Sequence, residues 1–583
     1  MGWAGRGLTV VSPRSSVLFS DFTLPTLTEL HTLPSNVAKL ITLRSGGSNF
    51  IMTNTSPQSW TCTGHSGKTH DEIENWGDTC SFPGCPMVRG QDGKATLPQK
   101  PIPTIPVNPI IIGAALLLLS ALGVGVGVVF LKDIITGGGG SNPIPTPSIS
   151  SPTPSISPSS TPTSFDPTWI SAGERTLNRT QANPFRDRGV EAFIAGNFAE
   201  AVTQFEKAVL GNRNDPELQI YLNNAKARLK GSPLVVATVV PIDNRLNIAQ
   251  DMLRGMADAQ TRFNDAGGAG GRLVEIMIAN DGNEPARAQM IAQNLANNPN
   301  VLGVIGHNSS KASQAALPEY EKVGLAMISP TSTSDYLSGN VFLRTVPSDR
   351  ESVKILAEYA KNKLSIQKIA VFYDPNSPFS KNSFEVFENA FKQLGGEVYT
   401  AIDLTRQDLD VKQEIQSLRN QVTAIILFPD PSNISNAISL AQANAQVSGT
   451  KFQLLGGDSL YGSDILTSGG NAIEGLIIAV PWVANNQPYA QAAYQRWGGA
   501  INWRTASSFD ATIALLKALS ENPTRASVLQ DLKATNLPAS ETSGQQLQFN
   551  AQGERQEESM LVKVTKGAPN RPPNVDYGFQ LIQ

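Results

Sequence analysis

The sequence predicts an α/β fold in two lobes for residues 232–583. Short apolar runs of strand length alternate there with longer runs of helical spacing, which is typical of βαβ units and largely parallel sheets. About 350 residues exceed the size of one hydrophobic core, so we expect two lobes. A cleft between two lobes is where we expect a small ligand to be enclosed.

The expected strands are 234–240, 273–279, 301–305, 325–329, 368–373, 397–403, 424–427, 453–456 and 476–478. The expected helices between them are 248–265, 284–296, 351–363, 379–394 and 434–446. The glycine-rich run 267–271 precedes a strand, whereas a phosphate-binding loop would connect a strand to a helix. This run is therefore predicted to be a turn.

An uncharged apolar run, residues 109–131, is long enough to cross a bilayer as one helix, which takes about 20 residues. Arg89, Lys94 and Lys100 precede this run, and only Lys132 follows it closely. The positive-inside rule therefore places residues 1–108 in the cytoplasm and everything after the predicted transmembrane helix in the periplasm.

Two segments separate the predicted membrane span from the lobes. Residues 132–183 are rich in Pro, Ser, Thr and Gly and are expected to form a linker. Residues 184–231 have apolar and small residues at helical spacing and predict a helical hairpin. The spacing of Gly189, Phe193 and Phe205 resembles one tetratricopeptide repeat, and a plain helical hairpin explains it equally well.

The three cysteines of the chain all lie in the N-terminal region. Within residues 60–88, four residues with ribbon-like spacing are candidate ligands of one zinc ion: Cys62, His65, Cys80 and Cys85. The alternative is a cluster of free thiols, which a reducing cytoplasm tolerates. No cofactor is expected in the lobes.

Composition argues against two classes of function. The 46 basic and 49 acidic residues give a net charge of −3, which offers no electrostatic basis for nucleic-acid binding. The lobes contain a single histidine, His307, and the sequence has no Walker A, HExxH or GxSxG pattern. An enzyme is therefore not expected, and we expect His307 to be structural.

Two clusters of hydroxyl residues mark a candidate binding site. Ser309 and Ser310 follow the expected strand 301–305 and open a helix, and residues 331–334 follow the strand 325–329. In open α/β sheets, ligands bind beyond the carboxyl ends of strands, and a helix N-terminus there attracts an anion. The two clusters could hold one small carboxylate. Taken singly, each is also explained as a helix cap or a turn.

Five stretches of the lobes together point to a known family. They read FNDAGGAGGRLVEIMIANDGNEPARA, VLGVIGHNSSKASQAALP, LAMISPTSTSDYL, VFLRTVPSD and IEGLIIAVPW. In this order they resemble the type 1 periplasmic substrate-binding proteins of the leucine/isoleucine/valine-binding class, the receptors of amino-acid ABC importers. The resemblance implies the type 1 periplasmic-binding-protein fold with a hinged cleft. Together with the predicted membrane span and helical segment, the chain looks like receptor-type proteins of cyanobacteria.

The resemblance also implies a role for individual residues. Ser310 corresponds to the serine that binds the ligand α-carboxylate, and Ser309 stands beside it. Asp458 matches the acidic position that pairs with the ligand α-ammonium. The loop that binds the amino-acid main chain corresponds to three hydroxyl residues, Thr331, Ser332 and Thr333.

Other candidates line the same expected pocket. Phe379 takes the place of a tyrosine that the family often has, and thereby lacks a hydroxyl. Phe428 and Asp430 stand near another pocket position of the family. Tyr461 is a candidate for packing on the ligand and is equally explained as a core residue. Without the resemblance, Asp458 could also be a solvated loop acid.

The sequence therefore predicts a membrane-anchored receptor that binds an amino acid or a related amide by closure of two lobes. One hypothesis is delivery of this ligand to an ABC permease. The other is a sensor or scaffold that signals across the membrane without transport, which the tether and the N-terminal region of 1–108 favour.

Overall fold

The computed structural model describes residues 164–556, 558–568, 571 and 574–582, together with the backbone of eight short strands between Leu8 and Thr96. The chain divides into two units, Met1–Ser141 and Asn142–Gln583. None of the helices in the described residues combines the length and apolar character needed to cross a bilayer. The predicted span 109–131 lies outside the described residues, as does the predicted linker up to residue 163.

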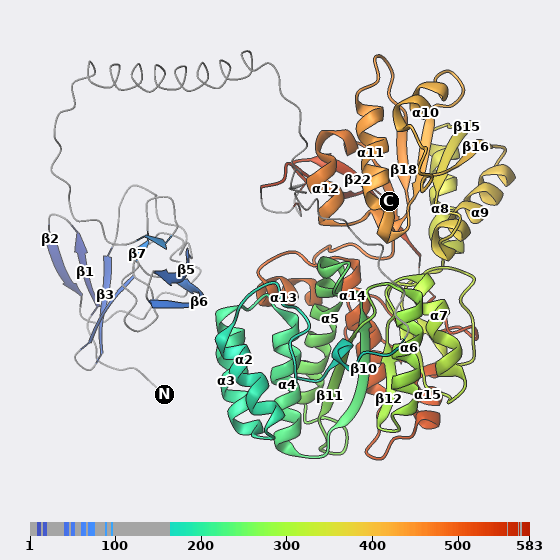
Figure 1. Cartoon of the computed structure of the whole chain (residues 1–583). Coiled ribbons are helices and arrows are strands. Elements are labelled where there is room, and N and C mark those ends of the chain that lie inside the picture. The colour runs from blue at the N-terminus through green and yellow to red at the C-terminus, as the bar shows by residue number, and fades with distance from the viewer. Residues whose placement is uncertain are drawn as a thin grey trace, which may run out of the picture. The chain divides into compact units, whose positions relative to one another are not determined.

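In the N-terminal unit, the described elements are strands (Figure 1). The first four form an antiparallel sheet in the order β2-β1-β3-β4: β1 (Leu8–Ser12), β2 (Ser15–Phe19), β3 (Leu40–Ser45) and β4 (Ser48–Met52). Two further antiparallel pairs are β5 (Trp60–His65) with β6 (Lys68–Asn75) and β7 (Val88–Arg89) with β8 (Ala95–Thr96).

The predicted zinc ligands belong to this unit. Cys62 and His65 fall on β5, where the structure describes the backbone alone, and Cys80 and Cys85 lie outside the described residues. Among the described residues, no group of three or more His, Cys, Asp or Glu side chains is placed to hold a metal. The zinc hypothesis therefore stays a prediction.

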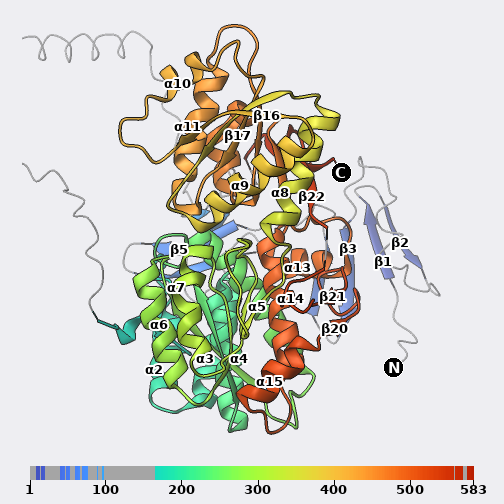
Figure 2. The same cartoon turned by 90° about the vertical axis from the view of Figure 1, so that its right-hand side faces the viewer.

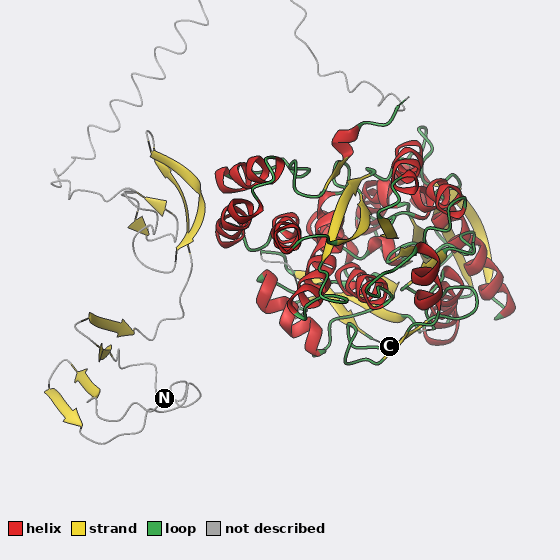
Figure 3. Cartoon of the chain, turned by 90° about the horizontal axis from the view of Figure 1, so that it is seen from below, coloured by secondary structure: helices red, strands yellow, loops and turns green. Residues whose placement is uncertain are grey.

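The second unit contains two lobes (Figure 1), and helices surround the strands in it (Figure 3). Lobe 1 has a six-stranded sheet in the order β14-β13-β12-β10-β11-β9. Its strands are β9 (Ile170–Ser171), β10 (Leu234–Val240), β11 (Val274–Asn280), β12 (Val301–Ile305), β13 (Met327–Ser329) and β14 (Phe342–Arg344). All pairs are parallel except β9 with β11. Its first helices are α5 (Leu246–Asp265), α6 (Pro285–Asn297) and α7 (Ser310–Glu321).

Lobe 2 has a seven-stranded sheet in the order β16-β15-β17-β18-β19-β22-β23. Its strands are β15 (Lys368–Tyr373), β16 (Glu397–Asp403), β17 (Ala424–Phe428), β18 (Gln453–Gly456), β19 (Ile477–Val480), β22 (Met560–Lys566) and β23 (Tyr577–Leu581). The sheet is parallel up to β19, and β22 and β23 continue it antiparallel. The last two strands were not among those expected from the sequence.

Three of the five helices that the structure describes in lobe 2 were expected from the sequence, at residues 349–358, 378–393 and 434–445. The five helices are α8 (Asp349–Glu358), with a π-helical turn at Tyr359–Lys363, α9 (Pro378–Gln393), α10 (Val411–Ser417), α11 (Ile434–Ala445) and α12 (Ser463–Gly469). Short 3₁₀ turns occur at Pro431–Asn433, Asp458–Leu460 and Gly470–Ile473. Proline at the first position of α9 suits a helix start, because its missing N–H would have no partner there.

After β19 the chain returns to lobe 1 with α13 (Pro488–Trp497), α14 (Trp503–Lys517), α15 (Arg525–Lys533) and the small hairpin β20 (Asn536–Leu537) and β21 (Leu547–Gln548). Figure 2 shows this red segment beside the green elements of lobe 1. α14 packs along α5 at a glycine. A Cβ on Gly255 would lie 2.1 Å from the carbonyl oxygen of Thr505, so only glycine permits this approach.

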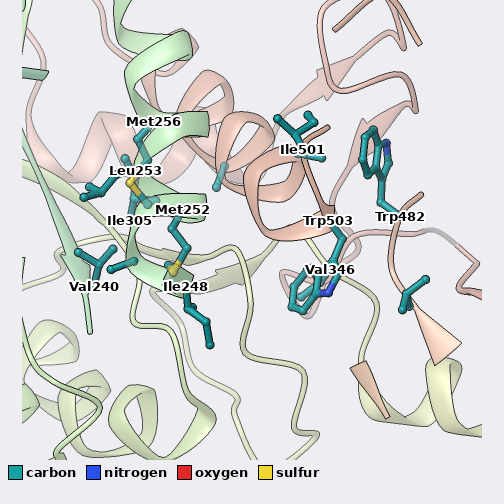
Figure 4. Packing of buried hydrophobic residues seen from close by; sticks show 14 of the residues in the cluster. Val240, Ile248, Met252, Leu253, Met256, Ile305, Val346, Trp482, Ile501 and Trp503 are labelled. Atoms are coloured by element: carbon teal, nitrogen blue, oxygen red, sulfur yellow. The ribbon is translucent and has the colours of Figure 1, made fainter. Parts of the chain in front are cut away.

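Buried apolar side chains surround α5 and the start of α14. Figure 4 shows Ile248, Met252 and Met256 of α5 beside Ile305, and Trp503 beside Val346. All of these side chains are at most 6% exposed. This packing fixes the start of α14, which borders the cleft described below.

Three crossings join the lobes, after β14, after β19 and before β22. The first and the third are tied together at Arg344, whose N–H donates to the carbonyl of Gly553 at 2.9 Å and whose carbonyl accepts from Arg555 at 3.1 Å. The Oγ atoms of Ser352, in the first helix after the first crossing, and of Ser559, directly before β22, lie 2.7 Å apart. Loop segments of this kind between two lobes are where hinge movements are absorbed.

Residues 164–231 belong to the same unit as the lobes. A 3₁₀ turn (Pro167–Trp169) and β9 lead to α2 (Pro184–Ile194), α3 (Phe198–Gly211) and α4 (Pro216–Lys230). α2 and α3 form the helical hairpin expected there, α4 matches a further helix expected after it, and the likeness to a tetratricopeptide repeat stays a prediction. The buried amide of Asn224 on α4 donates to the carbonyls of Ala172 and Ile276 at 2.7 and 2.8 Å. The end of the predicted linker and α4 are therefore bonded to the edge of the lobe 1 sheet.

Candidate functional site

A pocket lies between the lobes, at the carboxyl ends of their strands. It has about 340 Å³ of free space, including the solvent at its mouth. Lobe 1 contributes Asn308, Ser309, Ser310, Thr331, Trp503 and Arg504 to its wall. Lobe 2 contributes Phe379, Asp430, Pro431, Asp458 and Ser459. Ligands of open α/β sheets bind in this position.

The start of α7 forms part of the lobe 1 wall. Ser309 is the N-cap of this helix, and its Oγ accepts a hydrogen bond from the N–H of Ala312 at 3.2 Å. Ser310 is the first helical residue, and its Oγ accepts from the N–H of Ser334 at 3.4 Å. The first turn of a helix leaves backbone N–H groups without partners inside the helix, so this part of the wall favours an anion.

The second hydroxyl cluster is divided between the wall and its support. Thr331 lines the pocket and donates from Oγ1 to the carbonyl of Asn308 at 2.8 Å, which joins the two loops. Ser332 does not line the pocket, and its Oγ lies 2.8 Å from that of Ser313. The carbonyl of Thr333 accepts from the N–H of Asp349 at 2.8 Å, at the first crossing.

Asp458 begins a 3₁₀ turn in the lobe 2 wall and is 8% exposed. Burial raises the pKa of this carboxyl to about 6, and the positive charge of Arg504 opposes the rise. Arg504 makes no salt bridge with Asp458. Its guanidinium donates to the main-chain carbonyls of Tyr461 at 2.6 Å and Asp458 at 3.4 Å instead. The carboxyl therefore borders the pocket without an ion-pair partner among the described residues.

The remaining candidates differ in where the structure places them. Phe379, in the first turn of α9, lines the pocket. Tyr461 does not, and its ring stacks on that of Phe579 with centroids 4.1 Å apart, which agrees with the alternative of a core residue. Phe428 is fully buried and does not line the pocket.

Asp430 lines the pocket, but its carboxylate is already engaged. It accepts hydrogen bonds from Ser377 Oγ at 2.7 Å and from the N–H and Oγ of Ser432 at 2.9 and 2.7 Å. His307 is fully buried, with Nδ1 2.7 Å from Asp281 and Nε2 3.1 Å from the hydroxyl of Tyr320. Its two ring nitrogens are thus satisfied inside lobe 1, as a structural role requires.

The lobes touch on both sides of the pocket. The Oγ of Ser334 donates to the carbonyl of Pro378 at 3.2 Å, and Asn382 accepts from the N–H of Asp335 at 2.7 Å. On another side, the amide of Asn247 donates to Asp464 at 3.0 Å. Direct bonds from lobe to lobe away from the crossings indicate that the cleft is closed.

Comparison with known proteins identifies the family. Residues 245–568 match the sequence model of the family described as periplasmic binding protein. The chain belongs to this family. This periplasmic binding protein is 25% identical over 297 residues to the Leu/Ile/Val-binding protein of Escherichia coli K12. The match covers 48% of this chain and 78% of that relative. It is 24% identical over 272 residues to a leucine-, isoleucine-, valine-, threonine- and alanine-binding protein of Pseudomonas aeruginosa, covering 46% of this chain and 72% of the relative.

Solved structures agree on the fold of this periplasmic binding protein. A leucine-binding protein from Thermotoga maritima superposes with a TM-score of 0.53 and 20% identity, covering 60% of this chain and 99% of that one. A solute-binding protein from Rhodopseudomonas palustris, solved with 3,4-dihydroxybenzoic acid, gives a TM-score of 0.51 at 17% identity, covering 60% and 96%. The relatives are named as binding proteins and not as enzymes, which supports a non-enzymatic function at the level of the family.

Sequence reasoning missed five wall residues of this periplasmic binding protein: Asn308, Pro431, Ser459, Trp503 and Arg504. Trp503 and Arg504 enter the pocket because α14 returns to lobe 1 after the second crossing, and no local signal in the sequence indicates that return. Ser459 could have been found, because it directly follows Asp458 in the same turn.

Proposed function

We propose that the pocket binds a free amino acid as a zwitterion. The observation that carries this proposal is the buried Asp458 carboxyl, which borders the pocket without an ion-pair partner among the described residues. A ligand ammonium would supply that partner, and a buried charge that gains one is strongly favoured. The start of α7, with Ser310, offers donors to the ligand carboxylate on the facing lobe.

The relatives support the same class of ligand. By its name, the Escherichia coli relative binds leucine, isoleucine and valine. The Pseudomonas aeruginosa relative is named for binding these three amino acids and also threonine and alanine. By analogy, we infer delivery of the ligand to an ABC permease by a receptor that works outside the cytoplasm. The apolar run 109–131 would anchor it to the membrane by one helix. We keep zinc binding by the N-terminal Cys/His cluster as a proposal, which metal analysis of the purified chain tests.

A second function, sensing, is favoured by one specific observation. Residues 170–171 pair with β11, and Asn224 bonds α4 to the same sheet edge. The segment that leads from the predicted tether is thus bonded to lobe 1, and lobe movement could be transmitted along it. Loss of ligand uptake on deletion of the chain would support import. A retained physiological response without uptake would support sensing.

The experiment for the proposed function is a thermal-shift and calorimetry screen of the full chain against the standard amino acids, small amides and urea. A ligand far above its dissociation constant should stabilise the protein by about 3–4 kcal/mol. Asp458→Ala should abolish binding of any amino acid that is found. Binding that survives this substitution unchanged, or no response to any amino acid, would contradict the proposal.

A further inference from the structure

We propose that the pocket selects an amino acid whose side chain carries an uncharged oxygen acceptor, a carboxamide or a hydroxyl, and that Trp503 and Ser459 recognise this acceptor. The inference rests on the proposed function, because it names the side chain of the same ligand. The inference goes beyond the proposed function because it assigns the choice of ligand side chain to two residues.

Two buried polar groups in the pocket wall lack a hydrogen-bond partner among the described residues. They are Nε1–H of Trp503 and the Oγ of Ser459, on residues that are 2% and 4% exposed. Both residues line the pocket, Trp503 from lobe 1 and Ser459 from lobe 2. Buried polar groups are nearly always paired, so two unpaired groups at one pocket point to an occupant.

The indole of Trp503 is held in place. The guanidinium of Arg504 lies over its ring at 4.3 Å from the centroid. Arg504 is fixed in turn by its bonds to the carbonyls of Tyr461 and Asp458 across the cleft. A clamped indole presents its N–H in one direction, and an indole N–H can donate but not accept. The partner that it requires is therefore an acceptor.

The rest of the wall argues against a purely aliphatic side chain. Among the described residues that line the pocket, Phe379, Pro431 and the Trp503 ring offer apolar surface, and the others are polar or charged. An aliphatic group would cover the free N–H and O–H without bonding them, and a site built for hydrogen bonding rejects such a ligand strongly.

The charges in the wall favour an acceptor without charge. Asp430 and Asp458 are acidic, and Arg504 is the basic residue among the described lining residues. Arg504 is already bonded to two carbonyl groups. A second ligand carboxylate would add a negative charge beside two acids, whereas an amide or hydroxyl oxygen would not.

The test compares ligands of nearly identical shape by calorimetry on the full chain. Leucine, asparagine and aspartate share one branching pattern and differ in the two terminal groups. Asparagine should bind at least about tenfold more tightly than leucine. Trp503→Phe keeps an aromatic ring and removes the N–H, and Ser459→Ala removes the hydroxyl. Each should lower the ratio of asparagine to leucine affinity by about tenfold.

A matched control uses another buried indole. Nε1 of Trp497 donates to Asp258 at 3.0 Å, and this tryptophan does not line the pocket. Trp497→Phe should leave the affinity ratio unchanged, and melting temperatures of all variants check that each remains folded.

The outcomes separate the two proposals. If leucine binds at least as tightly as asparagine, or if Trp503→Phe weakens both ligands equally, the specificity inference is overturned while amino-acid binding stands. If aspartate binds more tightly than asparagine, the requirement for an uncharged acceptor is overturned. If no amino acid binds, the proposed function and the inference both fail.

Discussion

Replacing Asp458 by asparagine should make the ligand-free protein more stable while it removes amino-acid binding. Burial raises the pKa of this carboxyl from 3.8 to about 6. At about 1.36 kcal/mol per pH unit, keeping it ionised at pH 8 costs the folded state about 3 kcal/mol. Asparagine cannot ionise, so Asp458→Asn should raise the free energy of unfolding by up to about 3 kcal/mol at that pH.

The stability that Asp458→Asn gains over the wild-type protein should depend on pH. Because the folded pKa lies above the unfolded one, the folded state holds the extra proton between about pH 4 and pH 6. The wild-type protein therefore loses stability relative to the variant as the pH rises through this window. Above about pH 7 the difference should be constant, and below about pH 4 it should vanish.

The assay is urea unfolding of both proteins from pH 4 to pH 8. The proteins are first unfolded and refolded, so that bound ligand does not stabilise the wild type. Asp430→Asn is the contrasting control. Its carboxylate accepts hydrogen bonds from Ser377 and Ser432, so this change should destabilise. An Asp458→Asn protein that is less stable than wild type at pH 8, or a difference that does not change with pH, would refute the reasoning.

Three further outcomes are expected. Amino-acid affinity should fall about tenfold from pH 8 to pH 5, because the ligand ammonium pairs with the ionised carboxyl of Asp458 and only about a tenth of these carboxyls is ionised at pH 5. Calorimetry that shows no fall in affinity would contradict this. Gly255→Ala should lower the free energy of unfolding by about 1–3 kcal/mol, since the added Cβ would meet the carbonyl oxygen of Thr505. In the same urea unfolding assay, Gly462→Ala should have little effect, because the space around Gly462 is open. Asn224→Ala should lower the free energy of unfolding by about 1–3 kcal/mol and speed hydrogen exchange in α4. Unchanged exchange would show that the Asn224 amide does not hold α4 on the sheet.

Much of the fold could be predicted because its strands are apolar and short and its helices follow at regular intervals. β10, β12 and β15 coincide with expected strands, since strands covered on both faces read as unbroken apolar runs. The strands β22 and β23 escaped prediction because they complete the lobe 2 sheet from a distant part of the chain. The place of β22 depends on pairing with β19, and that of β23 on pairing with β22, which no local pattern encodes.

The candidate site was predictable where it follows strand ends. Ser309, Ser310 and Thr331 lie at the carboxyl ends of adjacent parallel strands, so their convergence follows from the sheet itself. The orientation of a side chain does not follow from the sheet. Tyr461, for example, stacks on Phe579 and does not line the pocket. Residues of α14 were missed because their position is set by the second crossing and by packing against α5.

The most direct test of the account is a crystal structure of the full chain with the amino acid that calorimetry finds to bind most tightly. The account predicts the ligand ammonium within about 3 Å of the Asp458 carboxylate, and the ligand carboxylate at the start of α7 beside Ser310. An amino acid bound in the reverse orientation, or outside the pocket with Asp458 still unpaired, would contradict it.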